Sequence, residues 1–318
     1  MVTAGTDPPA VTGDTDAGDG HGRAFPLRRL RVRWAWLFLA PSLVAAAAVA
    51  GWPLLRTASF AFTDARLSEL DAARWIGVEN FVAILGDPGW WRAVWNTLVF
   101  TVASVSLELV LGLAFALMLN ARLRGRPALR AVALVPWAVP TIVCAQMWSW
   151  MYHDVYGVLN DLLLRLGVIE APVAWLADPA TAMAAVIMTD VWKATPFMTL
   201  LLLAGLQIIP DHVYAAARID GAGPLRILVH ITLPLLRPAI VVALIFRSLD
   251  AFRVFDLIYV MTSNSRATAT VSVYARQHLI DFQDVGYGSA ASLLVFLLVG
   301  LISIGYVASL RPATEAAR

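Results

Sequence analysis

Lysine is almost missing from this sequence, and charged residues of any kind are few. Of the 24 basic residues all but Lys193 are arginine. Charged residues make up 14% of the chain and hydrophobic residues 59%, whereas a soluble domain carries roughly a quarter charged residues. A globular core cannot account for so much apolar sequence, so we expect lipid to be the solvent for most of it.

The single lysine excludes a nucleotide-binding P-loop on this chain. That motif needs Gly-Lys followed by Ser or Thr, because the lysine must reach the nucleotide phosphates. Lys193 lies instead in "VWKATP", where a tryptophan precedes it. If the chain moves a solute with ATP, a partner must supply the ATP site, and we expect no cofactor bound by this chain.

Cysteine and histidine exclude further kinds of chemistry. Cys144 is the only cysteine, so no intramolecular disulfide is possible, and its apolar neighbours indicate a buried thiol. The five histidines show no HExxH or comparable spacing, so no metal site is predicted. No GxSxG nucleophile motif occurs. We therefore predict no catalytic residues and expect that the chain is not an enzyme.

Long apolar runs predict an all-α membrane protein with six transmembrane helices. Residues 1–25 have almost nothing to bury and predict a disordered tail. The transmembrane domain is predicted over 26–312, and a short tail over 313–318. We interpret the first run as an uncleaved helix, although "AVAG" resembles a signal-peptide cleavage site. The predicted spans are Trp34–Leu55, Trp95–Leu119, Leu129–Met151, Thr181–Ile208, Leu235–Thr262 and Val285–Leu310.

Arginine counts predict how these spans are oriented. Fourteen arginines lie in the two tails and in the loops after the second and fourth spans, against seven in the other loops. Cytoplasmic loops carry the excess of basic residues. Both termini and the loop after the fourth span are therefore expected in the cytoplasm.

That loop, "IPDHVYAAARIDGAGPLRILVHITLPLLRP", covers residues 209–238 and is a polar interruption between two apolar runs. The small side chains of Ala215–Ala217 predict a narrow helix that a neighbouring backbone can approach. Gly221 is placed to end this helix in a left-handed conformation, and Pro234 and Pro238 to bend the chain back toward the membrane. The residues alone fit either a rigid docking helix or an ordinary interhelical loop.

Charged residues also occur inside the predicted fourth and fifth spans: Asp190, Lys193, Arg247, Asp250, Arg253 and Asp256. Each would be costly facing lipid, so we expect them to face protein or a wet cavity. Spacing of three lets Arg247 pair with Asp250, and Arg253 with Asp256. Two hypotheses stay open, structural ion pairs between helices and a polar translocation cavity. Glu108 in the second span fits a packed, hydrogen-bonded role.

Segment 209–238 resembles the EAA loop of permease subunits in binding-protein-dependent ABC importers, since "AAARIDGA" and "ITLPLLRP" match its residue types and spacing. Ala215 stands where that family usually has glutamate, so no salt bridge from this position is expected. Over nearly all six spans, "ELVLGLAFALML", "VWKATPFMTLLLLAGL", "FRVFDLIYVMT" and "GYGSAAS" resemble the carbohydrate-importing, MalF-like branch, closest to trehalose-importer permeases of the mycobacterial type. The usual Gly-Gly-Pro after "YVMT" is replaced by "SNSRAT".

The resemblance implies a type I ABC importer permease fold in the bacterial inner membrane, embedded in lipid as a multi-pass protein. It implies import of a disaccharide or short oligosaccharide, with trehalose as the expected sugar. The implied partners are a second homologous permease, an ATPase dimer carrying ATP and Mg²⁺, and an extracytoplasmic sugar-binding protein or lipoprotein, with no nucleic acid. The implied ATPase-coupling residues are Ala216, Asp220, Gly221 and Ala222. The implied substrate-pathway residues are Lys193, Ala194, Phe197, Arg247, Asp250 and Ala251.

The sequence leaves two other classes of membrane protein to consider. An ion-coupled secondary transporter could use Asp190, Asp250 or Asp256 as its ion site, but it predicts an inverted repeat and broken helices, which the sequence does not reveal. A membrane-embedded enzyme would need a nucleophile or metal cluster, and neither is found.

Overall fold

A computed structural model describes residues 24–121 and 125–315. These residues form helices joined by short loops, with two isolated β-bridges and no strand among them. The prediction of an all-helical chain is confirmed. The chain divides into two compact units, Met1–Arg56 and Thr57–Arg318. Most of the predicted tail 1–25, and part of the tail 313–318, lie outside the described residues.

The first unit contains α1 (Ala24–Ala46) and a π-helical turn, η1 (Ala47–Gly51), and α2 (Trp52–Phe60) begins within it. The wider turn keeps the helix continuous, because the Trp52 N–H donates to the Ala47 carbonyl. The stretch Trp34–Phe60 is long and apolar enough to cross a membrane. It extends the predicted first span by its last turn.

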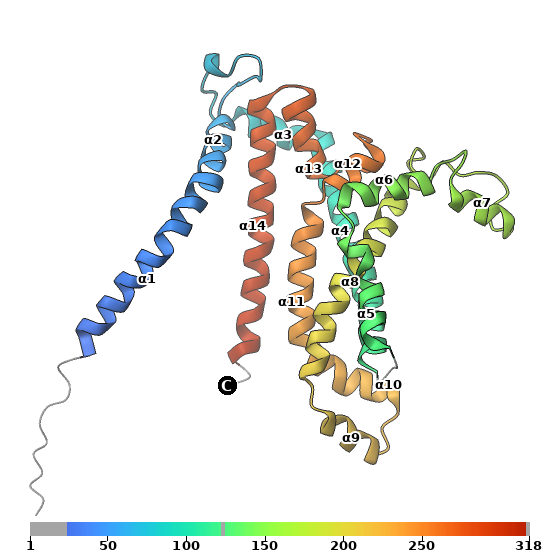
Figure 1. The fold of residues 1–318 in the computed structure, drawn as a ribbon. Helices are drawn as coiled ribbons and strands as arrows, with labels where there is room; N and C mark the ends of the chain where they lie inside the picture. The colour runs from blue at the N-terminus through green and yellow to red at the C-terminus, as the bar shows by residue number, and fades with distance from the viewer. Residues whose placement is uncertain (1–23, 122–124, 316–318) are drawn as a thin grey trace, which may run out of the picture. The chain divides into compact units, whose positions relative to one another are not determined.

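The second unit consists of long helices that run between its two ends and of shorter helices, several of which lie across those ends (Figure 1). They are α3 (Glu79–Gly86), α4 (Pro88–Asn120), α5 (Arg126–Ala138), α6 (Thr141–Met151), α7 (Val158–Arg165), α8 (Ala182–Ile208), α9 (Asp211–Ile219), α10 (Pro224–Ile227), α11 (Leu233–Phe252), α12 (Asp256–Thr262), α13 (Val271–Arg276) and α14 (Val285–Glu315). Within this unit, α9, α10 and the C-terminal end of α14 lie at one end, and α3, α12 and α13 lie at the other (Figure 1). We call these the α9 end and the α13 end.

Five helices of the described chain are long and apolar enough to cross a membrane, or six if one bent pair is counted as a single span. The bent pair corrects the predicted third span, Leu129–Met151. Its two halves, α5 and α6, meet at an angle of 89°. Val139 is extended there and Pro140 has no N–H to continue the helix, so the chain turns between them.

The predicted fifth span, Leu235–Thr262, is also wrong as a single helix. The α11 helix ends at Phe252, residues 253–255 are irregular, and α12 begins at Asp256. Backbone groups released by such a break need new partners inside a membrane. The Thr270 hydroxyl supplies one, donating to the Val254 carbonyl at 3.0 Å.

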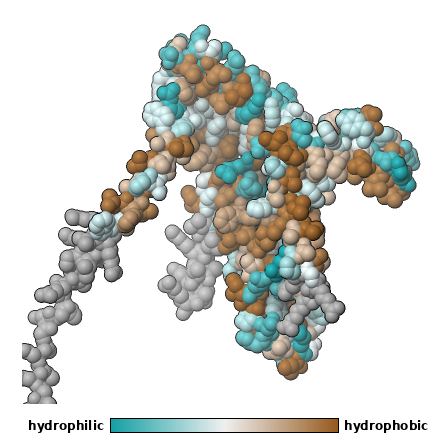
Figure 2. Space-filling view, viewed as in Figure 1, coloured by the Kyte–Doolittle hydropathy of each residue, from teal (hydrophilic) through white to brown (hydrophobic). Residues whose placement is uncertain are grey.

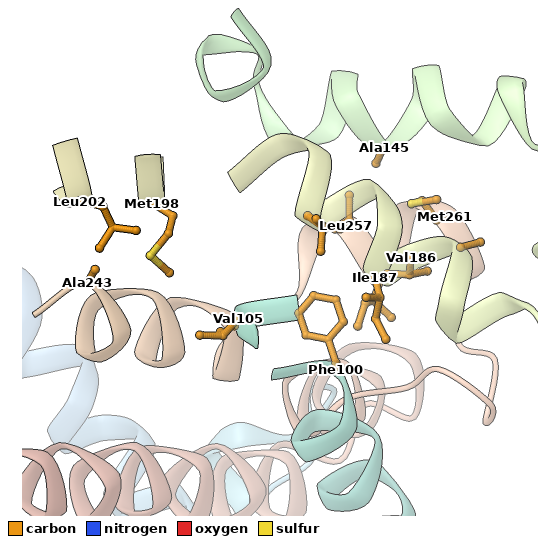
Figure 3. Close-up of a cluster of buried hydrophobic side chains, with 14 of the residues drawn as sticks. Phe100, Val105, Ala145, Val186, Ile187, Met198, Leu202, Ala243, Leu257 and Met261 are labelled. Carbon is orange, nitrogen blue, oxygen red and sulfur yellow. The ribbon is translucent and has the colours of Figure 1, made fainter. Parts of the chain in front are cut away.

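A buried apolar cluster joins α4, α6, α8, α11 and α12 (Figure 3). Phe100 of α4 points toward Ile187 of α8, and Leu257 of α12 lies near both. In lipid, helices gain from close packing rather than from removal of apolar surface from water. The α8 and α11 helices approach each other tightly at Gly205, which faces Ala239.

Apolar side chains also cover much of the outer surface of these helices, and hydrophilic ones gather toward the ends of the second unit (Figure 2). Many large apolar residues are exposed along α4, including Val102 and Val110 at 64% and 66%. Continuous apolar surface of this kind is unusual on a soluble monomer and fits a lipid-facing helix.

At the α13 end, a cluster of aromatic and acidic side chains ties α4 to α13 and α14. Asp87 caps α4, accepting a hydrogen bond from the Gly89 N–H at 2.8 Å. The Tyr274 hydroxyl donates to Asp87 at 2.5 Å and lies 2.8 Å from the Tyr287 hydroxyl. The His278 ring stacks on Tyr287 with centroids 4.3 Å apart. The partly buried His278 ring is therefore part of the packing of this cluster.

A methyl group at Gly205 is expected to loosen the α8–α11 contact. The added Cβ would press on the Ala239 Cβ and lie 2.8 Å from Leu236 Cδ1. Overpacking costs about 1–3 kcal/mol, which outweighs the roughly 1 kcal/mol that alanine gains over glycine in a helix. Gly205→Ala should lower the Tm in detergent, measured by size-exclusion chromatography after heating.

The matched control is Gly300→Ala in α14, where nothing lies within 4 Å of the added Cβ. This variant should keep or raise the Tm. Equal Tm values for the two variants would contradict a tight crossing of α8 and α11.

Acidification is expected to weaken the cluster at the α13 end through His278. Burial lowers the pKa of His278 below its usual 6.5, although the Asp284 and Asp87 carboxylates oppose the shift. The unfolded chain then binds this proton at a higher pH than the folded chain, so the stabilisation is lost as pH falls. The Tm advantage of wild type over His278→Gln should narrow between about pH 7.5 and about pH 5. An advantage that widens on acidification would show that the sign is wrong.

Candidate functional site

A cavity of about 220 Å³ opens beside the middle turns of α8, where the break between α11 and α12 faces the bent pair α5–α6. It is lined by Trp137, Thr141, Asp190, Lys193, Ala194, Phe197, Arg247, Asp250, Arg253, Val254, Phe255, Asp256 and Leu257. The break after α11 contributes residues 253–255 to its wall, and the bend between α5 and α6 contributes the flanking residues Trp137 and Thr141. Non-helical backbone at membrane depth is tolerated where it is buried in protein or lines a cavity.

Arg247 is the centre of the charge network behind this cavity. Its Nε and Nη2 donate to the two carboxylate oxygens of Glu108, at 2.6 and 2.9 Å. Nη2 also donates to Asp190, and Nη1 donates to Asp250 Oδ2 at 2.8 Å. The network joins α4, α8 and α11 through one guanidinium. The predicted Arg247–Asp250 pair is confirmed, and Glu108 has the hydrogen-bonded role expected of it.

Burial changes sharply across the network. The side chains of Glu108 and Arg247 are 0% and 3% exposed, whereas that of Asp250 is 72% exposed. Asp190 and Arg247 also line the cavity, but Asp250 is therefore the member whose carboxylate is most open to it. Within the part of the chain that the structure describes, Lys193 forms no ion pair. The predicted Arg253–Asp256 pair is also not formed between these two described residues, because the helix breaks between them and each faces the cavity separately.

Aromatic rings add flat apolar surface to the same wall. Trp137 of α5 stacks on Phe197 of α8 with centroids 6.1 Å apart and planes 16° apart. Phe255 stacks on Tyr259 at 5.4 Å. Charged groups in this cavity can exchange hydrogen bonds with the hydroxyls of a ligand, and its aromatic rings can pack on apolar ring faces. The cavity is therefore chemically suited to a polyhydroxylated ligand that has such faces.

Five of the six predicted pathway residues line this one cavity: Lys193, Ala194, Phe197, Arg247 and Asp250. Ala251 differs, since it is 1% exposed and packs in the apolar core. It is not among the residues that line the cavity. Trp137 and Thr141 also line the cavity but were not among the predicted pathway residues. They reach it because the chain bends at Pro140, and this proline is the feature of the sequence that could have indicated the bend.

Segment 209–238 forms a compact structure at the α9 end. The narrow helix predicted around Ala215–Ala217 is α9. Gly221 ends it with a positive φ of 75°, as expected, while the Ala222 N–H donates to the Ala217 carbonyl at 2.9 Å. This pattern closes the last turn of the helix.

The predicted bends at Pro234 and Pro238 do not end the helix, because a continuous helical stretch, which includes a π-helical turn, η3 (Leu228–Thr232), runs from Pro224 to Phe252. Within this stretch α10 lies across the α9 end, whereas α11 runs from there toward the α13 end (Figure 1). The chain also turns at residues 221–223, between α9 and α10. Around α9, a groove of about 910 Å³ is lined by Leu117, Asn120, Ala121, Asp211, Tyr214, Ala215, Arg218, Pro224, Leu225, Ile227, Leu228 and Thr232.

The predicted coupling residues lie at the tip of this segment. Ala216, Asp220 and Gly221 are exposed, and Ala222 is partly exposed. Ile219 and Leu225 beside them are 86% and 72% exposed. Over residues 24–121 and 125–315, no group of three or more His, Cys, Asp or Glu side chains is arranged to hold a metal ion.

A family model described as "Binding-protein-dependent transport system inner membrane component" matches residues 108–315. A trehalose/maltose transport system permease protein of Thermococcus litoralis is 49% identical over 233 residues, which are 73% of this chain and 78% of that protein. A trehalose transport system permease protein of Mycobacterium tuberculosis is 38% identical over 275 residues, 86% and 88% of the two chains. A sulfoquinovosyl glycerol transport system permease protein of Agrobacterium fabrum is 39% identical over 279 residues, 87% and 90% of the two chains.

Solved structures share the fold. A bacterial ABC transporter involved in alginate import aligns with a TM-score of 0.77 and 21% identity, covering 90% of this chain and 98% of that chain. A bacterial alginate ABC transporter, in complex with an alginate pentasaccharide-bound periplasmic protein, aligns with a TM-score of 0.77 and 22% identity, covering 91% of this chain and 97% of that chain.

Proposed function

Since the chain belongs to the family of binding-protein-dependent transport system inner membrane components, we propose that it is a permease subunit of an ATP-driven ABC importer for a disaccharide or short oligosaccharide. As a family member it is a multi-pass protein of the inner membrane. Trehalose is the sugar that we propose, because two relatives are trehalose or trehalose/maltose permeases by name.

The observation that carries this proposal is the cavity where both helix breaks meet. Its volume of about 220 Å³ is below the roughly 300–1,000 Å³ of a typical small-molecule site. The cavity is also partly open, so this chain alone does not enclose a ligand on all sides. This supports a pathway formed with a second homologous permease, whose facing wall would complete the site.

The chemistry of the wall supports a sugar as the ligand. Sugar hydroxyls both donate and accept hydrogen bonds, so Asp250 would accept from them and Lys193 would donate to them. The stacked Trp137–Phe197 pair offers an apolar face to a pyranose ring. Ala194 would leave room beside Lys193, and Ala251 would act only by packing behind the wall.

Segment 209–238 would couple this chain to the energy source. We propose that Ala216, Asp220, Gly221 and Ala222 dock into a cleft of an ATPase dimer that binds ATP and Mg²⁺, while this chain binds no cofactor. Exposed apolar residues beside the tip, Ile219 and Leu225, support docking on a protein partner. The segment and the C-terminal end of α14 lie at the same end of their unit (Figure 1), which suits a common cytoplasmic side, the side also proposed for the N-terminus.

An extracytoplasmic binding protein would deliver the sugar to the opposite end. The family description itself refers to binding proteins, and one solved relative in fold is a complex with a sugar-bound periplasmic protein. Closure of the ATPases around ATP would then move the docked segments and open the paired permeases outward. Such coupling links two distant sites through one conformational equilibrium.

An ion-coupled transporter is the second candidate, and one observation favours it. Broken helices that carry an acidic residue are typical of such transporters, and the α11–α12 break has Asp250 and Asp256 on either side. Against it, Arg247 binds both Asp190 and Asp250, so a cation at either carboxylate would lie beside a buried guanidinium and be repelled by it. The family membership also favours the ATP-driven mechanism.

Gly221→Asp is expected to abolish sugar uptake while leaving the protein in the membrane. The positive φ of 75° at Gly221 costs a residue with a side chain about 1–2 kcal/mol, and the new carboxylate changes the docking tip. Uptake of labelled trehalose, maltose and glycerol 3-phosphate would be measured in cells lacking this chain, rescued by each variant.

Gly223→Asp is the matched control, because Gly223 has a φ of −71° and open space around it. This variant adds the same charge without the strain and should retain more uptake. Wild-type uptake by Gly221→Asp would contradict the coupling role. Rescue of a different solute by wild type would leave the family standing and overturn trehalose.

Lys193→Ala is expected to lower the maximal rate of sugar uptake several-fold with docking on the ATPase intact, because it removes a cationic donor from the cavity wall. Lys193→Arg keeps the charge and should retain part of the activity. Initial rates of labelled sugar uptake, together with co-purification of the ATPase, would measure both effects. Unchanged uptake of every tested sugar would remove Lys193 from the pathway.

A further inference from the structure

We propose that Arg247 is a positioning residue, anchored by Glu108 and Asp190, that holds Asp250 at the cavity and does not itself bind the transported sugar. The proposal rests on the proposed function for the identity of the ligand, but its geometry is independent of which solute is moved. It assigns a role to Glu108, which does not line the cavity but holds Arg247, a residue of its wall.

The hydrogen bonds of the guanidinium leave little capacity for a substrate. Arg247 has five N–H donors, and four hydrogen bonds run from its three nitrogens to Glu108, Asp190 and Asp250. The two bonds to Glu108 form a bidentate pair, the geometry that fixes a guanidinium in orientation as well as in place. A side chain that is 3% exposed and held in this way serves as an internal support.

Asp250 is held by this support but remains open to the cavity. Its Oδ2 accepts from Arg247 Nη1 at 2.8 Å, so Oδ1 remains available to a ligand hydroxyl. Asp250 lies in the last turn of α11, directly before the break at residues 253–255. Because Asp250 lies so close to the break, holding its carboxylate in place would also hold the end of α11. It would thereby position Arg253 and Asp256, which follow in the cavity wall.

The anchors come from two other membrane helices. Glu108 lies on α4 and is fully buried, and Asp190 lies on α8 with its side chain 11% exposed. A polar group in a membrane helix is tolerated when it is paired inside the protein. A movement of α4 or α8 relative to α11 would pull on Arg247 and shift Asp250, so the network relays helix packing to the cavity.

A double-mutant cycle tests this relay in the assembled transporter. Glu108→Gln keeps the shape of the anchor and removes its charge, and Asp250→Asn does the same at the cavity. Initial rates of ATP-driven uptake of labelled trehalose and maltose would be measured in proteoliposomes containing this chain, its partner permease, the ATPase and the binding protein. Each single variant should lower the rate about tenfold, and the double variant should be no slower than the slower single variant.

Asp256→Asn is the matched control, because Asp256 lines the same cavity without contacting Arg247. Its effect should multiply with that of Glu108→Gln. A general loss of packing would couple Glu108→Gln to both aspartates alike. Additive effects with Asp250, or equal coupling to Asp250 and Asp256, would overturn the proposal.

A second measurement does not depend on any sugar. In a Cys144→Ala background, the rate at which a maleimide labels Arg253→Cys reports the position of the break after α11. Glu108→Gln should change this rate several-fold and leave labelling of an exposed loop position, Asp154→Cys, unchanged. An unchanged rate at Arg253→Cys would contradict the relay. If the wild-type complex moved no sugar, the proposed function would fail, and labelling alone would decide this inference.

Discussion

The arrangement of the helices around the cavity depends on one buried guanidinium and the three carboxylates that it binds. Charges inside a membrane must pair with each other or face water, and Arg247 meets this constraint by binding Glu108, Asp190 and Asp250 from α4, α8 and α11. The network joins the three helices beside the cavity, and Asp250 is by far the most exposed of its carboxylates.

The helix breaks serve the same constraint. Irregular backbone in a membrane needs cover or water, and both breaks border the cavity. At the α13 end the Thr270 hydroxyl satisfies the carbonyl of Val254. At the α9 end Gly221 gives the chain a sharp reversal without strain. In the proposed function, the helices between these ends would transmit a movement of segment 209–238 to the cavity.

Hydropathy alone predicted where α4, α8 and α14 cross the membrane, because their apolar runs are long and uninterrupted. It could not predict the end of α11, since "FRVFDLIYV" stays apolar enough to read as one span. The charge spacing correctly paired Arg247 with Asp250. It could not identify Glu108 as a partner of Arg247. The two residues are 139 positions apart in the chain, and only the packing of α4 against α11 brings them together. The sequence does contain Pro140, a residue that often ends a helix, but the predicted third span ran through it as a single helix.

The central claim is that an ATPase partner drives sugar through a pathway that this chain half encloses. The most direct test is uptake of labelled trehalose into proteoliposomes that contain the complete transporter, with ATP or an imposed proton gradient as the energy source. The account predicts uptake that requires ATP, the binding protein and both permeases, and that ignores the gradient. Uptake driven by the gradient without ATP would contradict it and favour an ion-coupled carrier.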